Sequence, residues 1–214
     1  MKIVEASTQE QFDKISDKFT GIIAIHDGVI NIRKAYRNST IEVYGDSKVT
    51  IKADNKIKTY HHSHVIVYGF CKAIGRNNSK IEAYNNSNVV AYNDCEISTY
   101  DCANVKAFDN CLVLSHCRSN VIALDNAVVN AYDNSFIRSF DEAVVYAYDS
   151  SKVMAAKGTT LNDNRQKESP KSKNKKPQKM SIEEIVAEAD KLGMSYGNYQ
   201  RMRYSKYLEE RATK

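Results

Sequence analysis

Residues Ala131–Ser150 read AYDNSFIRSFDEAVVYAYDS, a stretch that opens and closes on nearly the same phrase. Ala-Tyr-Asp-Asn-Ser begins at Ala131, and Ala-Tyr-Asp-Ser-Ser begins sixteen residues later at Ala147. The segment Ser139–Ala143 between them keeps the same pattern at half that distance. A pattern that returns at a short fixed interval is typical of a repeat protein.

The repeat is eight residues long and runs without a gap from Ser39 to Gly158, which makes fifteen octads. Position 1 is small, position 3 is Ile or Val in fourteen octads, and position 5 is mostly Ala, Thr, Ser or Val. These alternate positions share one face of a strand, and their sizes suit a thin interior. Positions 7 and 8 are mostly Asp, Asn or Gly, which tolerate tight corners. The pattern predicts a mostly β fold, a β-solenoid whose coils pair with one another.

The number of octads in one coil decides the shape of the solenoid. Two octads would give a flat coil, and three would give a triangular prism. In a flat coil the outward residues Leu112, Val128 and Val144, which are sixteen apart, form one column with Leu114 and Tyr146 beside it. This column favours two octads, and three remains the alternative.

The segment before the octads, residues 1–38, is predicted to close the first coil. Ser7–Phe19 has an apolar stripe at helical spacing, and Thr8 with Gln11 three residues on is a capping-box pattern. Gly21–Ile32 reads as irregular first strands that are out of phase with the octads. The solenoid domain itself is predicted to cover residues 39–161.

After the solenoid the composition changes sharply. Residues 162–180 carry seven basic and two acidic residues, whereas residues 1–160 are balanced, so we expect a flexible Lys-rich linker there. Residues 181–214 then read as a small helical segment. Its candidate contacts to a partner or to a second copy of the chain are Tyr196, Tyr199 and Met202. Candidate contacts to nucleic-acid phosphates are Lys173, Lys175, Lys176, Arg201, Arg203 and Lys206.

The sequence lacks the marks of several other classes of protein. It contains no Gly-rich phosphate loop, no spaced Cys pairs and no nucleophile motif, so we expect neither an enzyme nor a bound cofactor. It has no apolar run long enough for a membrane span, and its first residues do not resemble a signal peptide. An odd count of five cysteines favours free thiols in a reducing, cytoplasmic compartment.

Cysteine and histidine are the candidate metal ligands of this sequence. Cys71, Cys95 and Cys111 stand at position 1, where Ser and Ala otherwise occur, so they read as small core residues. Cys102 and Cys117 fall at corners, and the sequence gives them no role. The cluster of His61, His62 and His64 could bind a metal, but no acidic or Cys partner is fixed nearby, so we expect no metal site.

The octads SKIEAYNN, SNVVAYND and AVVNAYDN resemble eight-residue repeats in uncharacterised proteins of bacteriophages and mobile elements of Gram-positive bacteria. FDKISDKFTGIIAI is similar to the segment that precedes such repeats, and ADKLGMSYGNYQ resembles a short helical segment at the C-terminus of small proteins from the same genomes. The resemblance covers most of the chain. It implies a β-solenoid and a phage or mobile-element origin in a bacterial host cell, and it carries no known activity.

Charge is unevenly distributed along the octads. Residues 47–80 hold seven basic residues and one acid, whereas residues 81–150 hold ten acids and three basic residues. In the acidic part, Asp stands at position 7 in six octads, namely Asp101, Asp109, Asp125, Asp133, Asp141 and Asp149. Solubility and turn chemistry explain such residues in most proteins. The sharper interpretation is an acidic rod that imitates nucleic-acid phosphate and occupies a nucleic-acid-binding protein.

From these features we expect a non-catalytic interaction protein that binds and inhibits a host or anti-phage defence protein, in the manner of an anti-CRISPR protein. Its predicted partner-binding residues are Leu112, Leu114, Val128, Val144 and Tyr146, with Asp125, Asp133, Asp141 and Asp149. The helical segment would give a second contact or a homodimer. The alternatives are a nucleic-acid binder that uses the basic linker, and a structural spacer of a virion.

Overall fold

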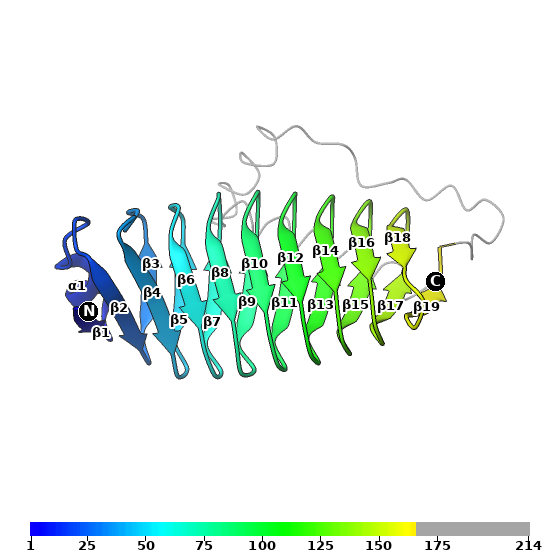
Figure 1. Cartoon of the computed structure of the whole chain (residues 1–214). Helices are drawn as coiled ribbons and strands as arrows, with labels where there is room; N and C mark the ends of the chain where they lie inside the picture. The colour runs from blue at the N-terminus through cyan, green and yellow to red at the C-terminus, as the bar shows by residue number, and fades with distance from the viewer. Residues whose placement is uncertain (166–214) are drawn as a thin grey trace, which may run out of the picture. The chain divides into compact units, whose positions relative to one another are not determined.

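Two parallel β-sheets run the length of residues 1–165, the part of the chain that the computed structural model describes (Figure 1). The ten-stranded sheet contains, in spatial order, β1 (Ile3–Ala6), β2 (Gly21–His26), β4 (Ser39–Tyr44), β6 (Lys56–Thr59), β8 (Lys72–Gly75), β10 (Asn88–Ala91), β12 (Asn104–Ala107), β14 (Asn120–Ala123), β16 (Phe136–Ser139) and β18 (Lys152–Ala155). The nine-stranded sheet contains β3 (Val29–Ile32), β5 (Lys48–Ile51), β7 (His64–Val67), β9 (Lys80–Ala83), β11 (Glu96–Thr99), β13 (Leu112–Ser115), β15 (Val128–Ala131), β17 (Val144–Ala147) and β19 (Thr160–Asp163).

Successive strands alternate between the two sheets, so the chain winds into a β-solenoid of about ten turns, as the sequence predicts. In the octads each strand pairs in parallel with the strand sixteen residues away; Val129, for example, lies between Val113 and Val145. Two octads therefore make one coil, which is the arrangement that the outward column favours. The earlier pairings are longer, since Gly21 lies opposite Ser39 and Val29 opposite Lys48, which confirms the irregular first strands.

The interior is built from the alternate positions of each strand. Ile97 and Thr99 of β11 are almost completely buried, whereas Glu96, the first residue of the strand, points outward and is exposed. Position 1 is small, and some of its serines serve the corner: the hydroxyls of Ser63 and Ser119 each donate to the carbonyl three residues back at 2.7 Å. The buried hydroxyls of Ser87 and Ser135 at the same position have no such partner. Small and β-branched side chains thus let the two sheets lie close together.

Most corners turn through a residue at position 7 in the left-handed conformation. Asn93, Asp109 and Asp125 have φ angles of 63°, 55° and 54°, and the same position is left-handed in the other octad corners from Gly45 to Asp149, except at Ala53. The carboxylate of the next coil accepts the backbone N–H of this residue: Asn93 donates to Asp109 at 2.8 Å, and Asp109 donates to Asp125 at 3.2 Å. The acidic columns are therefore part of the corner structure.

The helix near the N-terminus is shorter than the sequence predicts. The expected range was Ser7–Phe19, but α1 spans only Gln9–Asp13, with the capping box between Thr8 and Gln11 present. The chain leaves the helix because it must turn back into β2, and backbone hydrogen bonds from Ile15 to Phe12 and from Phe19 to Ser16 close two turns instead. The helix lies against β1 and β3.

Two predicted segments fall wholly or largely outside the described residues: the linker 162–180, of which the structure describes only the first four residues, and the helical segment 181–214. The residues predicted to contact nucleic acid or a partner in these two segments, from Lys173 to Lys206, lie outside the described residues as well.

The corner chemistry gives a prediction for Asp109. We expect Asp109→Ala to lower the free energy of unfolding by about 2 kcal/mol, because alanine resists a left-handed backbone and the bond from Asn93 is lost. Asp109→Asn is the matched control, since asparagine keeps the acceptor and tolerates the conformation. It should lose less than half as much in urea unfolding. Equal losses would show that the charge, and not the corner geometry, stabilises the coil.

Candidate functional site

The outward face of the nine-stranded sheet consists of columns of side chains that run along the solenoid axis. Residues at position 2 of each octad form one column and residues at position 4 form the next, because strands stack in register every sixteen residues. Along the position 2 column the chemistry changes between β11 and β13, from Lys80 and Glu96 to Leu112 and Val128. We call β5–β11 the charged half and β13–β17 the apolar half, although the position 4 column is mixed in both.

Ion pairs across neighbouring coils occupy the charged half. His64 on β7 lies 3.0 Å from the carboxylate of Glu82 on β9, and Lys80 lies 3.3 Å from Glu96 on β11. Glu82 is 4% exposed and also accepts a hydrogen bond from the Tyr84 hydroxyl at 3.1 Å. A buried carboxylate with more than one donor, such as that of Glu82, is a satisfied structural group.

The apolar half, which we name the apolar patch, brings together five of the residues that the sequence selects. Leu112, Val128 and Val144 are direct neighbours across β13, β15 and β17, and Leu114 and Tyr146 stand in the adjacent column with Asn130 between them. Leu112 is 37% exposed and the other four are half-buried. The structure therefore shows one continuous apolar surface on three neighbouring strands.

Carboxylates flank the patch at both ends of its strands. Asp125 and Asp141 lie at the corners that precede β15 and β17, and Asp133 and Asp149 lie at the corners that follow these strands. Each of the four accepts a backbone N–H from the preceding coil, as Asp133 does from Cys117 at 2.9 Å. The six aspartates of position 7 thus form two acidic columns, one on each side of the face, with Cys117 interrupting the second.

A ladder of stacked rings borders the same face, a feature that the sequence analysis did not predict. Six rings at position 6, namely those of Tyr68, Tyr84, Tyr100, His116, Tyr132 and Tyr148, stack with centroids 4.7–5.2 Å apart and planes within 14° of parallel. Aromatic residues repeated every sixteen positions are the signal that could have revealed it. The ladder adds rigidity to this edge of the solenoid, because offset ring pairs are attractive beyond the area they bury.

The histidines and cysteines form no metal centre in the described part of the chain. His61 adopts the left-handed corner conformation, and His64 pairs with Glu82. No group of three or more His, Cys, Asp or Glu residues within 1–165 is arranged to hold a metal ion. All five thiols are free; burial raises the pKa of Cys71, and burial raises that of Cys117 to about 11.

Comparison with protein-family models, with curated proteins and with solved structures finds no match to this chain. Among the described residues, no helix is long and apolar enough to span a membrane. The patch, its acidic borders and the ring ladder are therefore the observations on which a function must be argued.

The single histidine in the ring ladder predicts a dependence of stability on pH. Burial lowers the pKa of His116 from its ordinary 6.5, although Asp133 and Asp149 oppose the shift. The unfolded chain therefore takes up a proton near pH 6.5 that the folded ring does not bind, so stability falls as pH falls through this value. His116→Tyr, which restores the residue of the neighbouring coils, should lose less stability between pH 7.5 and 5.5 in urea unfolding. An identical loss in both proteins would contradict the buried neutral ring.

Proposed function

We propose that the protein is a non-catalytic scaffold that binds another protein through the apolar patch. The observation that carries the proposal is the patch itself: Leu112, Leu114, Val128, Val144 and Tyr146 point outward from three strands that the solenoid holds rigidly. An outward apolar surface with a polar border is typical of protein interaction sites, and a rigid surface loses little conformational entropy on binding.

The borders of the patch indicate the chemistry of the partner. Asp125 and Asp141 on one side and Asp149 on the other are exposed or half-exposed, so a bound surface would meet carboxylates at both ends of the strands. Such a border favours an apolar partner surface rimmed by Lys or Arg and raises its rate of association. Basic surfaces of this kind are common on nucleic-acid-binding proteins. This supports the interpretation that the protein imitates nucleic-acid phosphate in front of such a partner.

In this proposal the bound partner is a protein of a bacterial host or of an anti-phage defence system, and binding inhibits it. The support is the resemblance of the octads to repeats in phage and mobile-element proteins, and the cytoplasm of a bacterial cell is part of the proposal. We also propose that the fifteen octads are the building units of the scaffold and that α1 caps its first coil. The helical segment 181–214 would supply a second contact.

Binding to nucleic acid is the second candidate function. Its support is the excess of five positive charges in residues 162–180, followed by Arg201, Arg203 and Lys206. Binding through phosphate contacts weakens steeply between about 50 and 200 mM salt, whereas binding through an apolar patch does not. Salt therefore separates the two candidates. A virion spacer would need neither the patch nor the basic residues.

The test of the proposed function uses one apolar residue on each face. Leu114 on β13 and Ile122 on β14 are both half-buried, both stand at position 4, and they point outward from opposite sheets. We expect the full-length protein to retain another protein, in a fixed molar ratio, from nuclease-treated bacterial lysate. The salt concentration is about 0.5 M, several-fold above the range in which phosphate contacts hold. Leu114→Lys should reduce the retained amount at least about tenfold, and Ile122→Lys should not.

Retention that is equal in both variants would show that the patch is not the binding surface. Retention of nucleic acid alone, only from untreated lysate and only at low salt, would support the second candidate instead. We expect the solenoid to stay intact in both variants, because each lysine replaces a side chain that already reaches solvent. Circular dichroism of both variants checks this.

A further inference from the structure

The C-terminal end of the described solenoid is open. In the preceding coil, Ile137, Ser139, Val145 and Ala147 fill the inward positions and are completely buried. In the last coil, by contrast, Val153 is half-buried, Ala155 is exposed and Leu161 is 38% exposed. Each of β18 and β19 is paired on one side only within residues 1–165. The core and two strand edges therefore reach the surface together at this end.

The N-terminal end differs because α1 lies over it. Ile30 and Ile32 on β3, the last strand at that end, are fully buried. The Gln9 side chain takes the place of a neighbouring strand: its carbonyl accepts from the Asn31 N–H at 2.7 Å, and its amide donates to the Asn31 carbonyl at 3.2 Å. Phe12 packs against Tyr36 at 5.4 Å between ring centroids. The first coil thus has both its core and one edge covered.

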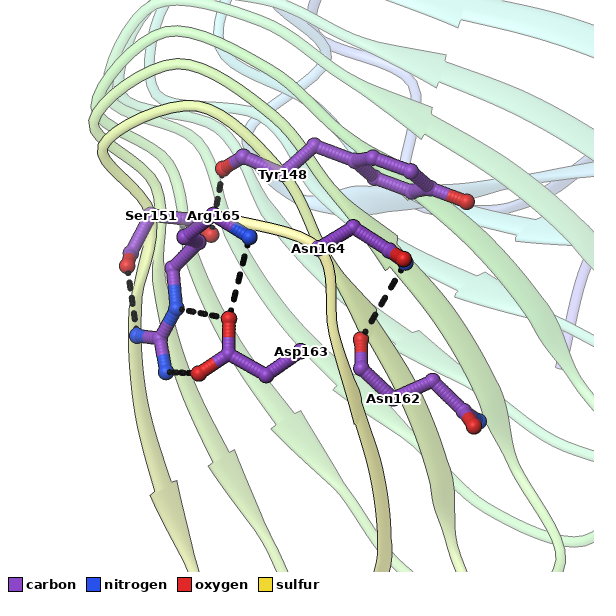
Figure 2. A network of polar contacts seen from close by, with 6 residues as sticks. All are labelled: Tyr148, Ser151, Asn162, Asp163, Asn164 and Arg165. Carbon is purple, nitrogen blue, oxygen red and sulfur yellow. Dashed lines mark hydrogen bonds and ion pairs between the residues drawn. The ribbon is translucent and has the colours of Figure 1, made fainter. Parts of the chain in front are cut away.

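At the open end, Arg165 binds the Asp163 carboxylate and the Ser151 carbonyl, and the inward positions of β18 and β19 stay at least partly exposed. Figure 2 shows its guanidinium against the Asp163 carboxylate, with distances of 2.8 and 2.5 Å, and against the Ser151 carbonyl at 3.0 Å. Asp163 stands at an inward position, opposite the buried Ala147. The Arg165 guanidinium holds the pKa of this carboxyl at about 2, so the pair is ionised together and its charges offset each other. The pair therefore brings no net charge of its own to a contact with a second copy.

From these features we infer that two copies of the chain associate through their C-terminal coils, end to end, about a two-fold axis. An open strand edge is a template for another strand, and an exposed core position next to it supplies apolar area. A head-to-tail contact could pair only the β1 edge, because α1 and Gln9 cover the core and the β3 edge at the opposite end, whereas a two-fold contact pairs both edges and closes after two copies. The inference is independent of the proposed function, since it uses a different surface.

The two-fold operation sets the pairing. An axis along the sheet normal places β18 antiparallel to β18 of the second copy and β19 antiparallel to its counterpart. The N–H groups of Lys152 and Ala156 bond back to Ser135 and Ser139, so by alternation those of Val153 and Ala155 face the open edge. A register centred on Met154 puts Val153 opposite Ala155 of the second copy and keeps inward residues inward.

The mass of the full-length protein in solution tests the inference. Light scattering behind size exclusion should give about twice the chain mass of 24.2 kDa. Ala155→Lys places a charge at the centre of the contact and should return the mass to that of one chain, whereas Ile122→Lys, two coils away and outward, should leave it doubled. Circular dichroism checks that both variants remain folded. A wild-type protein that is monomeric at all concentrations would overturn the inference and leave this end to another occupant.

Cross-linking tests the orientation separately. A mixture of unlabelled and 15N-labelled full-length protein, treated with an amine-reactive linker, should give mixed-isotope links between Lys157 of one copy and Lys157 of the other. Links between Lys157 and Lys14, which follows α1, would show a head-to-tail contact and contradict the two-fold arrangement. A doubled mass that persists in Ala155→Lys would place the contact elsewhere and would also overturn the inference.

Discussion

The left-handed residue at the seventh position of the octads, which recurs from Gly45 to Asp149 with the exception of Ala53, is the constraint on which the rest of the structure depends. It closes these corners in the same number of residues, and the backbone N–H of this residue is bound by a carboxylate of the next coil where Asp is present, as at Asp109 and Asp125. Because every side of the coil then has the same length, each strand meets the strand sixteen residues away without slipping. The buried interior, the ring ladder and the outward columns all follow from this register.

A surface made of columns can change its chemistry along the axis while its shape stays constant. On the nine-stranded sheet the position 2 column runs from Lys80 and Glu96 to Leu112 and Val128 without a change in backbone. The charged part is held by polar contacts between coils, such as that of His64 with Glu82, whereas the side chains of the apolar part make no such contacts. This contrast is why we assign binding to the apolar patch and structure to the charged half.

The sequence predicts the class of fold well because a short pattern of one strand face and one corner recurs along it at a fixed period. It also selected the residues of the patch, since Leu112, Val128 and Val144 are sixteen apart. It could not show that the aspartates are bound by the corner backbone, because this depends on the height of one coil above the next. Nor could it show the short α1 or the part played by Gln9 and Arg165, since single side chains at the two ends follow no period.

The coil register is the central claim, and disulfide trapping tests it most directly. Val128→Cys with Val144→Cys places two thiols on neighbouring parallel strands, where Cα atoms are roughly 4.8 Å apart and a disulfide can close. Val128→Cys with Lys152→Cys would be neighbours only in a coil of three octads. After mild oxidation and peptide mapping by mass spectrometry, we expect the 128–144 bond in the first protein and no 128–152 bond in the second. The reverse result would contradict the two-octad coil and, with it, the patch.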